Sequence, residues 1–247
     1  MLTALGDGSL FGEKFGEGPV RVIWLHGWAR RGEDFAAAAR LLAARGVPSL
    51  AVDLPGFGAS GAPKHAGGAR YYAELIAPAM DELGEDVVLV GHSFGGTVAT
   101  VLAARASARY RGVVLTGAPV IRGGSGRAPW RYRLVRAAAR RHLVSRARLE
   151  AARQRYGSLD YRRASGVMRE ILVATVNESF EDELARQHQP VSFLWGEHDT
   201  EVPLAIAERA RDLVTTPTTL RVVEGVGHLV PTEAPGALVD VVLEALA

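Results

Sequence analysis

The chain has 247 residues, no cysteine and a formal net charge of +2. Its length fits one α/β domain with an insertion. The absence of cysteine excludes disulfides, thiolate catalysis and cysteine-ligated metal sites. The near balance of charges gives no strong general attraction to nucleic acid. Met1–Asp7 lacks the basic and apolar parts of a signal peptide. No apolar run approaches the ~20 residues of a membrane-spanning helix. We therefore expect a soluble cytoplasmic protein that binds neither nucleic acid nor membranes.

Strands and helices are predicted to alternate along the first half of the chain. Short apolar runs predict strands, and alanine-rich or amphipathic runs predict helices. In chain order the predicted elements are strand Val20–Leu25, helix Asp34–Arg45, strand Val47–Val52, helix Tyr71–Leu83, strand Asp86–Val90, helix Thr97–Ala104 and strand Gly112–Thr116. Apolar strands separated by helices are typical of a parallel sheet that is covered on both faces.

Between about residues 120 and 189 the pattern changes to helical segments alone. These are Trp130–Arg155, Tyr161–Thr175 and Glu181–His188, with a predicted hinge at Gly123-Gly124-Ser125-Gly126. Alternation then resumes with strand Val191–Trp195, helix Leu204–Val214, strand Leu220–Val223 and helix Ala237–Leu246. We predict one α/β domain over residues 1–247, with a mostly parallel central sheet, helices on both faces and an inserted helical cap at about 120–189.

The segment Gly91-His92-Ser93-Phe94-Gly95-Gly96 lies between a predicted strand and a predicted helix. In that setting the pattern G-x-S-x-G indicates a nucleophile elbow, a strained turn that exposes a serine. The start of the following helix favours any negative charge that forms there. A second interpretation stays open at this point. The glycines could serve only close packing of strand and helix, with Ser93 as a helix cap.

Two later loops supply the groups that a serine nucleophile needs. A serine hydroxyl requires a base, usually a histidine oriented by a carboxylate. Asp199 follows the strand Val191–Trp195, and His228 follows the strand Leu220–Val223. The order serine, acid, histidine fits a nucleophile elbow in an α/β sheet, and all three residues follow strand ends at one edge. Two other carboxylates, Glu197 and Glu201, are rival acids.

Together these pieces resemble the α/β-hydrolase fold superfamily, including carboxylesterases and pimeloyl-carrier-protein methyl ester esterases. The matching segments are His26-Gly27-Trp28, Asp53-Leu54-Pro55-Gly56-Phe57-Gly58-Ala59-Ser60, the elbow at Ser93, Gly196-Glu197-His198-Asp199 with Val202-Pro203, and Gly227-His228 with Glu233-Ala234-Pro235. The resemblance covers nearly the whole chain. It implies that Ser93 is the nucleophile, Asp199 the acid and His228 the base. It also implies an oxyanion hole formed by the backbone N–H groups of Trp28 and Phe94. It implies no metal and no organic cofactor.

Other residues near these motifs have more ordinary expected roles. We expect His26 to brace its loop by hydrogen bonds and Asp53 to fix the turn after its strand. His92 lies beside the nucleophile but is not expected to act as the base. Trp130, Tyr132 and Met168 are candidate substrate-pocket residues, and each is as well explained as ordinary core.

The sequence thus predicts a hydrolase that cleaves a carboxylic ester or thioester through an acyl-enzyme. Two alternatives stay open: C–C bond hydrolysis or a cofactor-free lyase step on the same fold, and a ligand-binding receptor with a hydrolase-like pocket. The predicted cap is rich in arginine, with Glu150 as the only acid in the stretch that contains Arg122, Arg127, Arg131, Arg133, Arg136, Arg140, Arg141, Arg146, Arg148, Arg153 and Arg155. These arginines predict either a solvated helical face or recognition of an anionic substrate or an acidic acyl-carrier protein.

Overall fold

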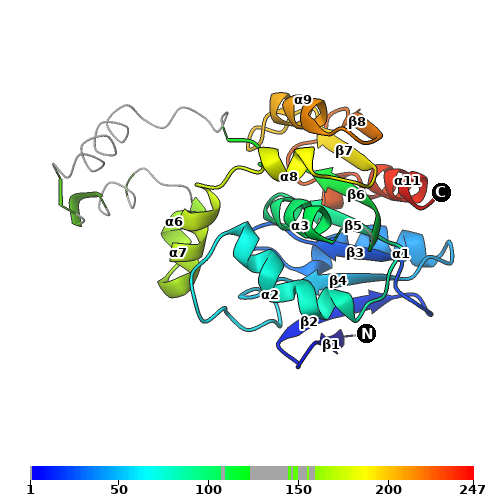
Figure 1. Ribbon diagram of the computed structural model, residues 1–247, viewed down its shortest axis with the longest axis horizontal. Coiled ribbons are helices and arrows are strands. Elements are labelled where there is room, and N and C mark those ends of the chain that lie inside the picture. Colours follow the sequence, from blue (N-terminus) through cyan, green and yellow to red (C-terminus); the bar gives the residue numbers. More distant parts are fainter. Residues whose placement is uncertain (1, 107–108, 123–143, 146, 150–154, 156–158) are drawn as a thin grey trace.

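A computed structural model of the protein places its strands in one twisted sheet (Figure 1). The structure describes residues 2–106, 109–122, 144–145, 147–149, 155 and 159–247. Within these residues the sheet has eight strands in the order β1-β2-β4-β3-β5-β6-β7-β8. The strands are β1 (Leu2–Leu5), β2 (Leu10–Phe15), β3 (Val22–Leu25), β4 (Ser49–Asp53), β5 (Val87–His92), β6 (Tyr110–Thr116), β7 (Val191–Gly196) and β8 (Thr218–Val223). Strands β1 and β2 pair antiparallel, and all pairs from β4 to β8 are parallel. The predicted mostly parallel sheet is confirmed.

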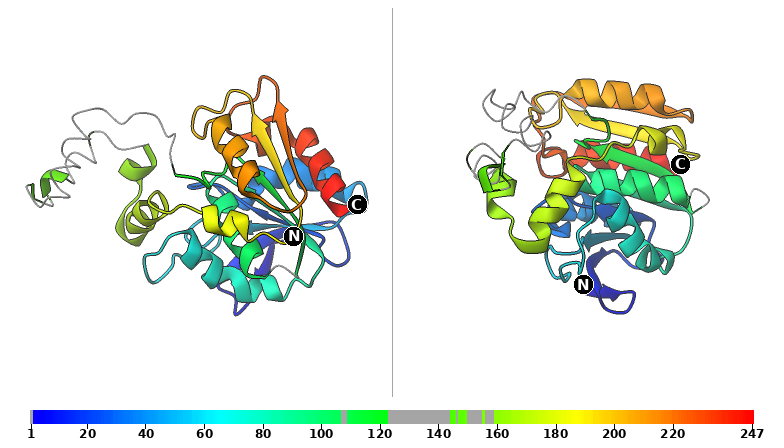
Figure 2. Two further views of the ribbon diagram at one scale, coloured as in Figure 1. Left: turned by 45° about the horizontal axis from the view of Figure 1, so that its top comes forward. Right: turned by 60° about the vertical axis from the view of Figure 1, so that its left-hand side comes forward.

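Helices cover both faces of this sheet, as Figures 1 and 2 show. The helices with described bounds are η1 (Gly32–Phe35), α1 (Ala36–Ala43), α2 (Ala69–Asp81), α3 (Phe94–Arg105), α6 (Leu159–Arg163), α7 (Gly166–Thr175), α8 (Glu181–Ala185), α9 (Leu204–Leu213), α10 (Val230–Glu233) and α11 (Pro235–Leu246). One core lies under α2, α3, α8 and α9, and a second core lies under α1 and α11. Side chains alternate along a strand, so Leu89 enters the first core and Val90 the second.

The central strands are apolar because neither of their faces meets water. Every residue of β3 and β5 is buried. In β8, the outermost strand at one side of the sheet, half-buried and exposed residues alternate over most of the length. Burial on both faces is therefore what makes the central strands readable as continuous apolar runs.

Strands β1 and β2 are not predicted by the sequence pattern. They form the antiparallel end of the sheet, where burial is partial. Three of the four residues of β1 are exposed or half-buried, and β2 contains Glu13 and Lys14. Neither strand therefore contains a continuous apolar run. Another difference lies in α3, which begins at Phe94 and not at Thr97, so that Ser93 directly precedes the helix.

The segment between β6 and β7 contains helices α6, α7 and α8 among the described residues. Figures 1 and 2 show α6 and α7 beside the start of α2, outside the layers that cover the sheet. The predicted helix Tyr161–Thr175 is divided in two, because α6 ends at Arg163 and α7 begins at Gly166 with a φ of +51°.

An ion pair contributes to the attachment of this segment to the body of the domain, beside the packing of α8 against the first core. Arg70 of α2 binds Glu183 of α8, with Nε 2.7 Å from Oε1. Most of the predicted helix Trp130–Arg155 lies outside the described residues, as does the predicted hinge at residues 123–126. The role of the inserted segment as a cap therefore stays a prediction.

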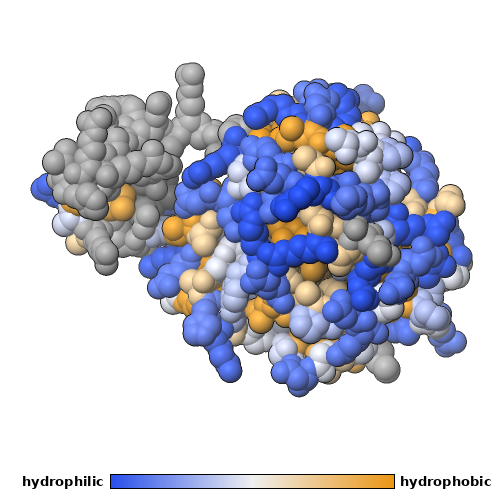
Figure 3. Space-filling view, viewed as in Figure 1, coloured by the Kyte–Doolittle hydropathy of each residue, from blue (hydrophilic) through white to orange (hydrophobic). Residues whose placement is uncertain are grey.

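The surface is mostly hydrophilic on the face shown in Figure 3, where apolar residues are exposed only in small separate areas. In the described part of the chain, no helix has both the length and the apolar character needed to cross a membrane.

Candidate active site

Ser93 occupies a strained turn between β5 and α3. Its backbone has φ +50° and ψ −116°, a conformation that residues other than glycine rarely adopt. Its N–H donates to the carbonyl of Thr116 at 2.8 Å, which ties the turn to β6. Although Ser93 stands at the first position before α3, its side chain makes no capping hydrogen bond. Ser93 thus occupies the N-cap position of α3, but its hydroxyl does not cap the helix.

Three glycines permit the close contacts around this turn. A Cβ on Gly91 would lie 2.5 Å from the Cα of Gly96. A Cβ on Gly95 would lie 2.1 Å from the carbonyl oxygen of Leu25, and one on Gly96 would lie 2.5 Å from the Cβ of Ala118. Such distances are shorter than atomic contacts allow. The glycines thus permit close packing, and the same packing holds the strained serine in place.

Asp199 and His228 form a hydrogen-bonded pair at the ends of β7 and β8. His228 Nδ1 lies 2.8 Å from Asp199 Oδ2, and the Asp199 side chain is only 1% exposed. The other carboxylate oxygen accepts hydrogen bonds from the N–H groups of Glu201 at 2.9 Å and Val202 at 2.8 Å. Because an ionised carboxylate only accepts, Nδ1 carries the shared hydrogen. In the neutral ring, Nε2 is then left with a free electron pair.

The two rival carboxylates do not reach the same nitrogen. Glu197 accepts a hydrogen bond from the N–H of Gly225 at 3.0 Å and so joins the β7 loop to the β8 loop. The carboxylate of Glu201 lies 3.7 Å from Nε2 of His228, on the other side of the ring from Asp199. Of these three carboxylates, only Asp199 therefore holds the ring through Nδ1.

His228 packs against the elbow. Its ring centroid is 4.8 Å from that of His92, the residue directly before Ser93. A Cβ on Gly117 would lie 2.7 Å from Cε1 of His228, so only glycine leaves room for the ring at this position. Glu233 supports the same loop by accepting a hydrogen bond from the N–H of Gly227 at 2.7 Å. The sequence analysis assigns no role to Gly117, and Glu233 enters it only as part of a segment that carries the family resemblance.

The loop after β3 lies against the elbow on another side. A Cβ on Gly27 would lie 3.3 Å from the Cβ of Ser93, which places the next residue, Trp28, beside the serine. Among the described residues, neither the Trp28 N–H nor the Phe94 N–H donates a hydrogen bond. Two unpaired amides beside a serine, one of them at a helix N-terminus, suit an oxyanion.

His26 and Asp53 brace this loop as predicted. His26 is fully buried, its Nδ1 lies 2.7 Å from the carbonyl of the next residue, and its Nε2 accepts from the N–H of Leu54 at 2.9 Å. Because Nε2 accepts a hydrogen bond, the ring is neutral, and burial lowers the pKa of His26 in the same sense. Asp53 accepts a hydrogen bond from the N–H of Ala59 at 2.8 Å and so fixes the turn after β4.

His92 is also neutral and structural. Burial, with a smaller effect of the nearby His228, lowers the pKa of His92 to about 3. Its Nδ1 lies 2.9 Å from the hydroxyl oxygen of Thr116. A ring so held is not available as a base for Ser93, in agreement with the sequence-based expectation.

An aromatic cluster lies next to the elbow. The ring of Trp28 meets those of Phe57 and Phe94 edge to face, at centroid distances of 5.1 Å and 5.5 Å. Tyr72 meets Phe94 at 4.9 Å. Trp28 and Phe57 are only partly buried. The cluster therefore offers an apolar surface beside Ser93.

Met168 of α7 contacts the loop that carries Phe57. A Cβ on Gly56 would lie 2.5 Å from the sulfur of Met168, and the hydroxyl of Tyr72 lies 4.0 Å from that sulfur. Met168 thus lies near the aromatic cluster, and its role in a substrate pocket stays a prediction. The other two candidates, Trp130 and Tyr132, lie outside the described residues.

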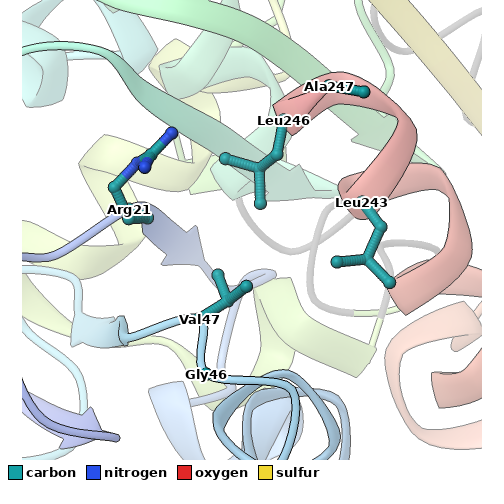
Figure 4. A pocket seen from close by; sticks show the side chains of 6 residues that line it. All are labelled: Arg21, Gly46, Val47, Leu243, Leu246 and Ala247. Carbon is teal, nitrogen blue, oxygen red and sulfur yellow. The ribbon is translucent and has the colours of Figure 1, made fainter.

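The described residues contain no group of three or more histidines, aspartates or glutamates placed to hold a metal ion. A separate pocket of about 280 Å³ appears in Figure 4. It is lined by Arg21, Gly46, Val47, Leu243, Leu246 and Ala247. This pocket lies where β3 begins. Strands β3 and β5 are parallel, and Ser93 follows the carboxyl end of β5. The pocket therefore lies at the amino ends of the strands, opposite to Ser93.

Comparison with known proteins identifies the family of the chain. The sequence model of the alpha/beta hydrolase family matches residues 22–241. The protein therefore belongs to the alpha/beta hydrolase family, and the fold predicted from the sequence is confirmed.

Individual relatives are similar over part of their length. A pimeloyl-[acyl-carrier protein] methyl ester esterase of Nitrosospira multiformis is 37% identical over 115 residues, which are 45% of this chain and 43% of that protein. The dihydrolipoyllysine-residue acetyltransferase component of the acetoin cleaving system of Cupriavidus necator is 31% identical over 87% of this chain and 60% of its own length. The chain thus spans about half the length of the curated relatives it matches.

Among solved structures, an esterase of Exiguobacterium antarcticum superposes with a TM-score of 0.76. It is 21% identical, and the match covers 99% of this chain and 98% of the esterase. At this level of identity the similarity shows a shared fold.

Proposed function

We propose that the protein is a serine hydrolase that cleaves a carboxylic ester or thioester through an acyl-enzyme. The observation that carries this proposal is the buried Asp199–His228 pair at the same sheet edge as the strained Ser93. Family membership and the ester-cleaving names of several relatives support the choice of bond.

The first half of the reaction acylates Ser93. His228 Nε2 takes the hydroxyl proton as Oγ attacks the carbonyl carbon of the substrate. The carbonyl oxygen becomes an oxyanion, which accepts hydrogen bonds from the Trp28 and Phe94 amides. Asp199 stabilises the positive charge on the His228 ring. His228 then gives its proton to the leaving alcohol or thiol as the bond from the carbonyl carbon to oxygen or sulfur breaks.

The second half releases the acid. His228 Nε2 takes a proton from water, and the resulting hydroxide attacks the acyl carbon. The same two amides hold the second oxyanion. The bond to Ser93 Oγ then breaks as His228 returns the proton to the serine. The products are a carboxylic acid and the free enzyme, so the cycle needs no redox partner.

The aromatic cluster of Trp28, Phe57 and Phe94 suits an apolar acyl chain. The name of the Nitrosospira multiformis relative adds acyl-carrier-linked esters to the substrates worth testing. Arg122, at the start of the arginine-rich segment, is already engaged, because its Nη2 donates to Asn177 Oδ1 at 2.9 Å. Most of the other arginines lie outside the described residues, so recognition of an acidic carrier stays a prediction, as does the cytoplasmic location.

A fluorophosphonate probe tests the proposal directly. We expect it to modify the purified protein at Ser93, because the probe reacts only with an activated serine and mimics the oxyanion. Labelling is mapped by peptide mass spectrometry. In parallel, esters of increasing chain length, thioesters and carrier-linked methyl esters are assayed, and products are identified. Absence of labelling with absence of turnover would favour the receptor alternative. Cleavage of a C–C bond without ester cleavage would favour the alternative of a C–C bond hydrolase or lyase on the same fold.

Gly117→Ala is expected to lower kcat/KM for esters by about 10²-fold or more, since small misplacements of catalytic groups have effects of this size. The new Cβ would lie 2.7 Å from His228 Cε1, and the backbone has φ +52°, so the ring must move. Steady-state kinetics on a p-nitrophenyl ester measure the loss.

Gly112→Ala is the matched control, because Gly112 lies in β6 and Gly117 directly follows the end of that strand. Its Cβ would lie 3.5 Å from the Cβ of Ala245, an ordinary contact. It should keep near-normal activity. Equal activity of the two variants would contradict the position assigned to the His228 ring.

A further inference from the structure

Glu201 lies beside the nitrogen of His228 that the proposed mechanism uses. Its Oε2 is 3.7 Å from Nε2, while Asp199 holds the ring through Nδ1. The Glu201 side chain is 70% exposed, and that of His228 is 9% exposed. The carboxylate therefore stands at the solvent side of an otherwise buried base.

The backbone of Glu201 is fixed by the same carboxylate that orients the base. Asp199 Oδ1 accepts hydrogen bonds from the N–H groups of Glu201 and Val202. The carbonyl of Val202 in turn accepts from the indole N–H of the buried Trp195 at 2.8 Å. Glu201 thus starts from a rigid turn at the rim of the site.

Among the described residues, Arg30 interacts electrostatically with Glu201 but does not cancel its charge. Arg30, on the loop after Trp28, forms a two-bond ion pair with Asp34, including an Nη2–Oδ1 distance of 2.9 Å. The pKa of Arg30 is raised mainly by this hydrogen-bonded partner, with a smaller contribution from Glu201. Arg30 and Asp34 balance each other, so the group of three carries a net negative charge at the rim.

The position of the Glu201 carboxylate places it near the leaving group of the substrate. In the proposed mechanism Nε2 hands a proton to the leaving group, so the leaving atom lies about 3 Å from Nε2. Since Glu201 Oε2 is 3.7 Å from the same nitrogen, the carboxylate lies within about 7 Å of the leaving atom.

We propose that Glu201 is a specificity residue that favours esters whose leaving alcohol carries a positive charge, such as an amino or quaternary ammonium group. It disfavours anionic leaving groups. This inference rests on the proposed function. It places any anionic part of the substrate on the acyl side, because a negative leaving group would be repelled by the carboxylate.

The ammonium of a choline ester is two carbons beyond the leaving oxygen and can turn toward Glu201. Opposite charges about 7 Å apart near a protein surface attract by an amount that changes kcat/KM about 3- to 30-fold, and salt weakens the effect. The matched substrates are a choline ester and the 3,3-dimethylbutyl ester of the same acid, which have similar shape and differ in charge. We expect the choline ester to be preferred at low ionic strength. Glu201→Gln should reduce the ratio of the two kcat/KM values by about threefold or more, and Glu201→Lys should invert it.

Glu224→Gln is the control, because it removes an exposed carboxylate from the loop after β8 that also carries His228. It should leave the ratio unchanged. An unchanged ratio in Glu201→Gln, with Ser93-dependent turnover of both esters, would overturn the inference while the proposed function stands. Absence of Ser93-dependent turnover of any ester in the wild-type protein would overturn both.

Discussion

Ser93→Ala is expected to lower kcat/KM for ester hydrolysis by about 10⁴- to 10⁶-fold, the range found when a nucleophile of this kind is removed. Alanine keeps the Cβ atom, so the strained backbone at φ +50° is no less accessible to it. The Asp199–His228 pair stays intact, but no oxygen remains to attack the carbonyl carbon. Turnover of a p-nitrophenyl ester and the melting temperature of both proteins measure the loss and show that the fold is kept.

A second serine serves as the control. Ser192 lies in β7, where its hydroxyl oxygen is 3.1 Å from that of Thr219, remote from the elbow. Ser192→Ala should retain activity. Turnover by purified Ser93→Ala close to the wild-type rate would reject Ser93 as the nucleophile and with it the proposed mechanism.

Asp199→Asn is expected to lower kcat by about 10⁴-fold, as a wrong histidine tautomer does in serine hydrolases. The N–H groups of Glu201 and Val202 would select the amide oxygen of the asparagine, because both donate to Oδ1 in the native structure. The amide NH₂ would then face Nδ1 of His228. To accept that hydrogen bond, His228 would move its proton to Nε2, where it can no longer take one from Ser93.

The rival carboxylate Glu197 provides the comparison. Glu197→Gln keeps an oxygen that can accept from Gly225 N–H and leaves His228 Nδ1 untouched, so its effect on kcat should be within about tenfold. Both variants are assayed by kcat on one ester, with circular dichroism to monitor the fold. A severe loss in Glu197→Gln together with a mild one in Asp199→Asn would reverse the assignment of the acid.

The central sheet could be predicted because its strands are buried on both faces. Runs such as Val87–Val90 are apolar at every position, and this pattern is visible without knowledge of the neighbours. The antiparallel strands β1 and β2 could not be predicted, since β1 pairs with β2 and β2 with β4 at the end of the sheet, where each strand is only partly buried. The start of α3 at Phe94 could not be predicted either, because Gly95 and Gly96 are poor helix formers. They are present because close packing leaves no room for a side chain at these positions.

The arrangement of the site could be predicted only in outline. Ser93, Asp199 and His228 each follow a strand, and parallel strands end at one edge, so their proximity follows from sequence order. The sequence does not show which nitrogen of His228 meets which carboxylate. The pairing of nitrogen and carboxylate depends on how the loops after β7 and β8 fold over each other. This pairing is what distinguishes Asp199, which faces Nδ1, from Glu201, which faces Nε2. The steric role of Gly117 depends on the same packing.

The proposed site is divided among loops that follow β3, β5, β7 and β8. During synthesis the elbow at Ser93 is complete long before Asp199 and His228 have been made. A chain that ends before β7 therefore contains the serine but lacks the groups proposed to activate it. The proposed catalytic activity requires that β7 and β8 have joined the sheet, because Asp199 and His228 follow these two strands. Until then Ser93 has no base to activate it.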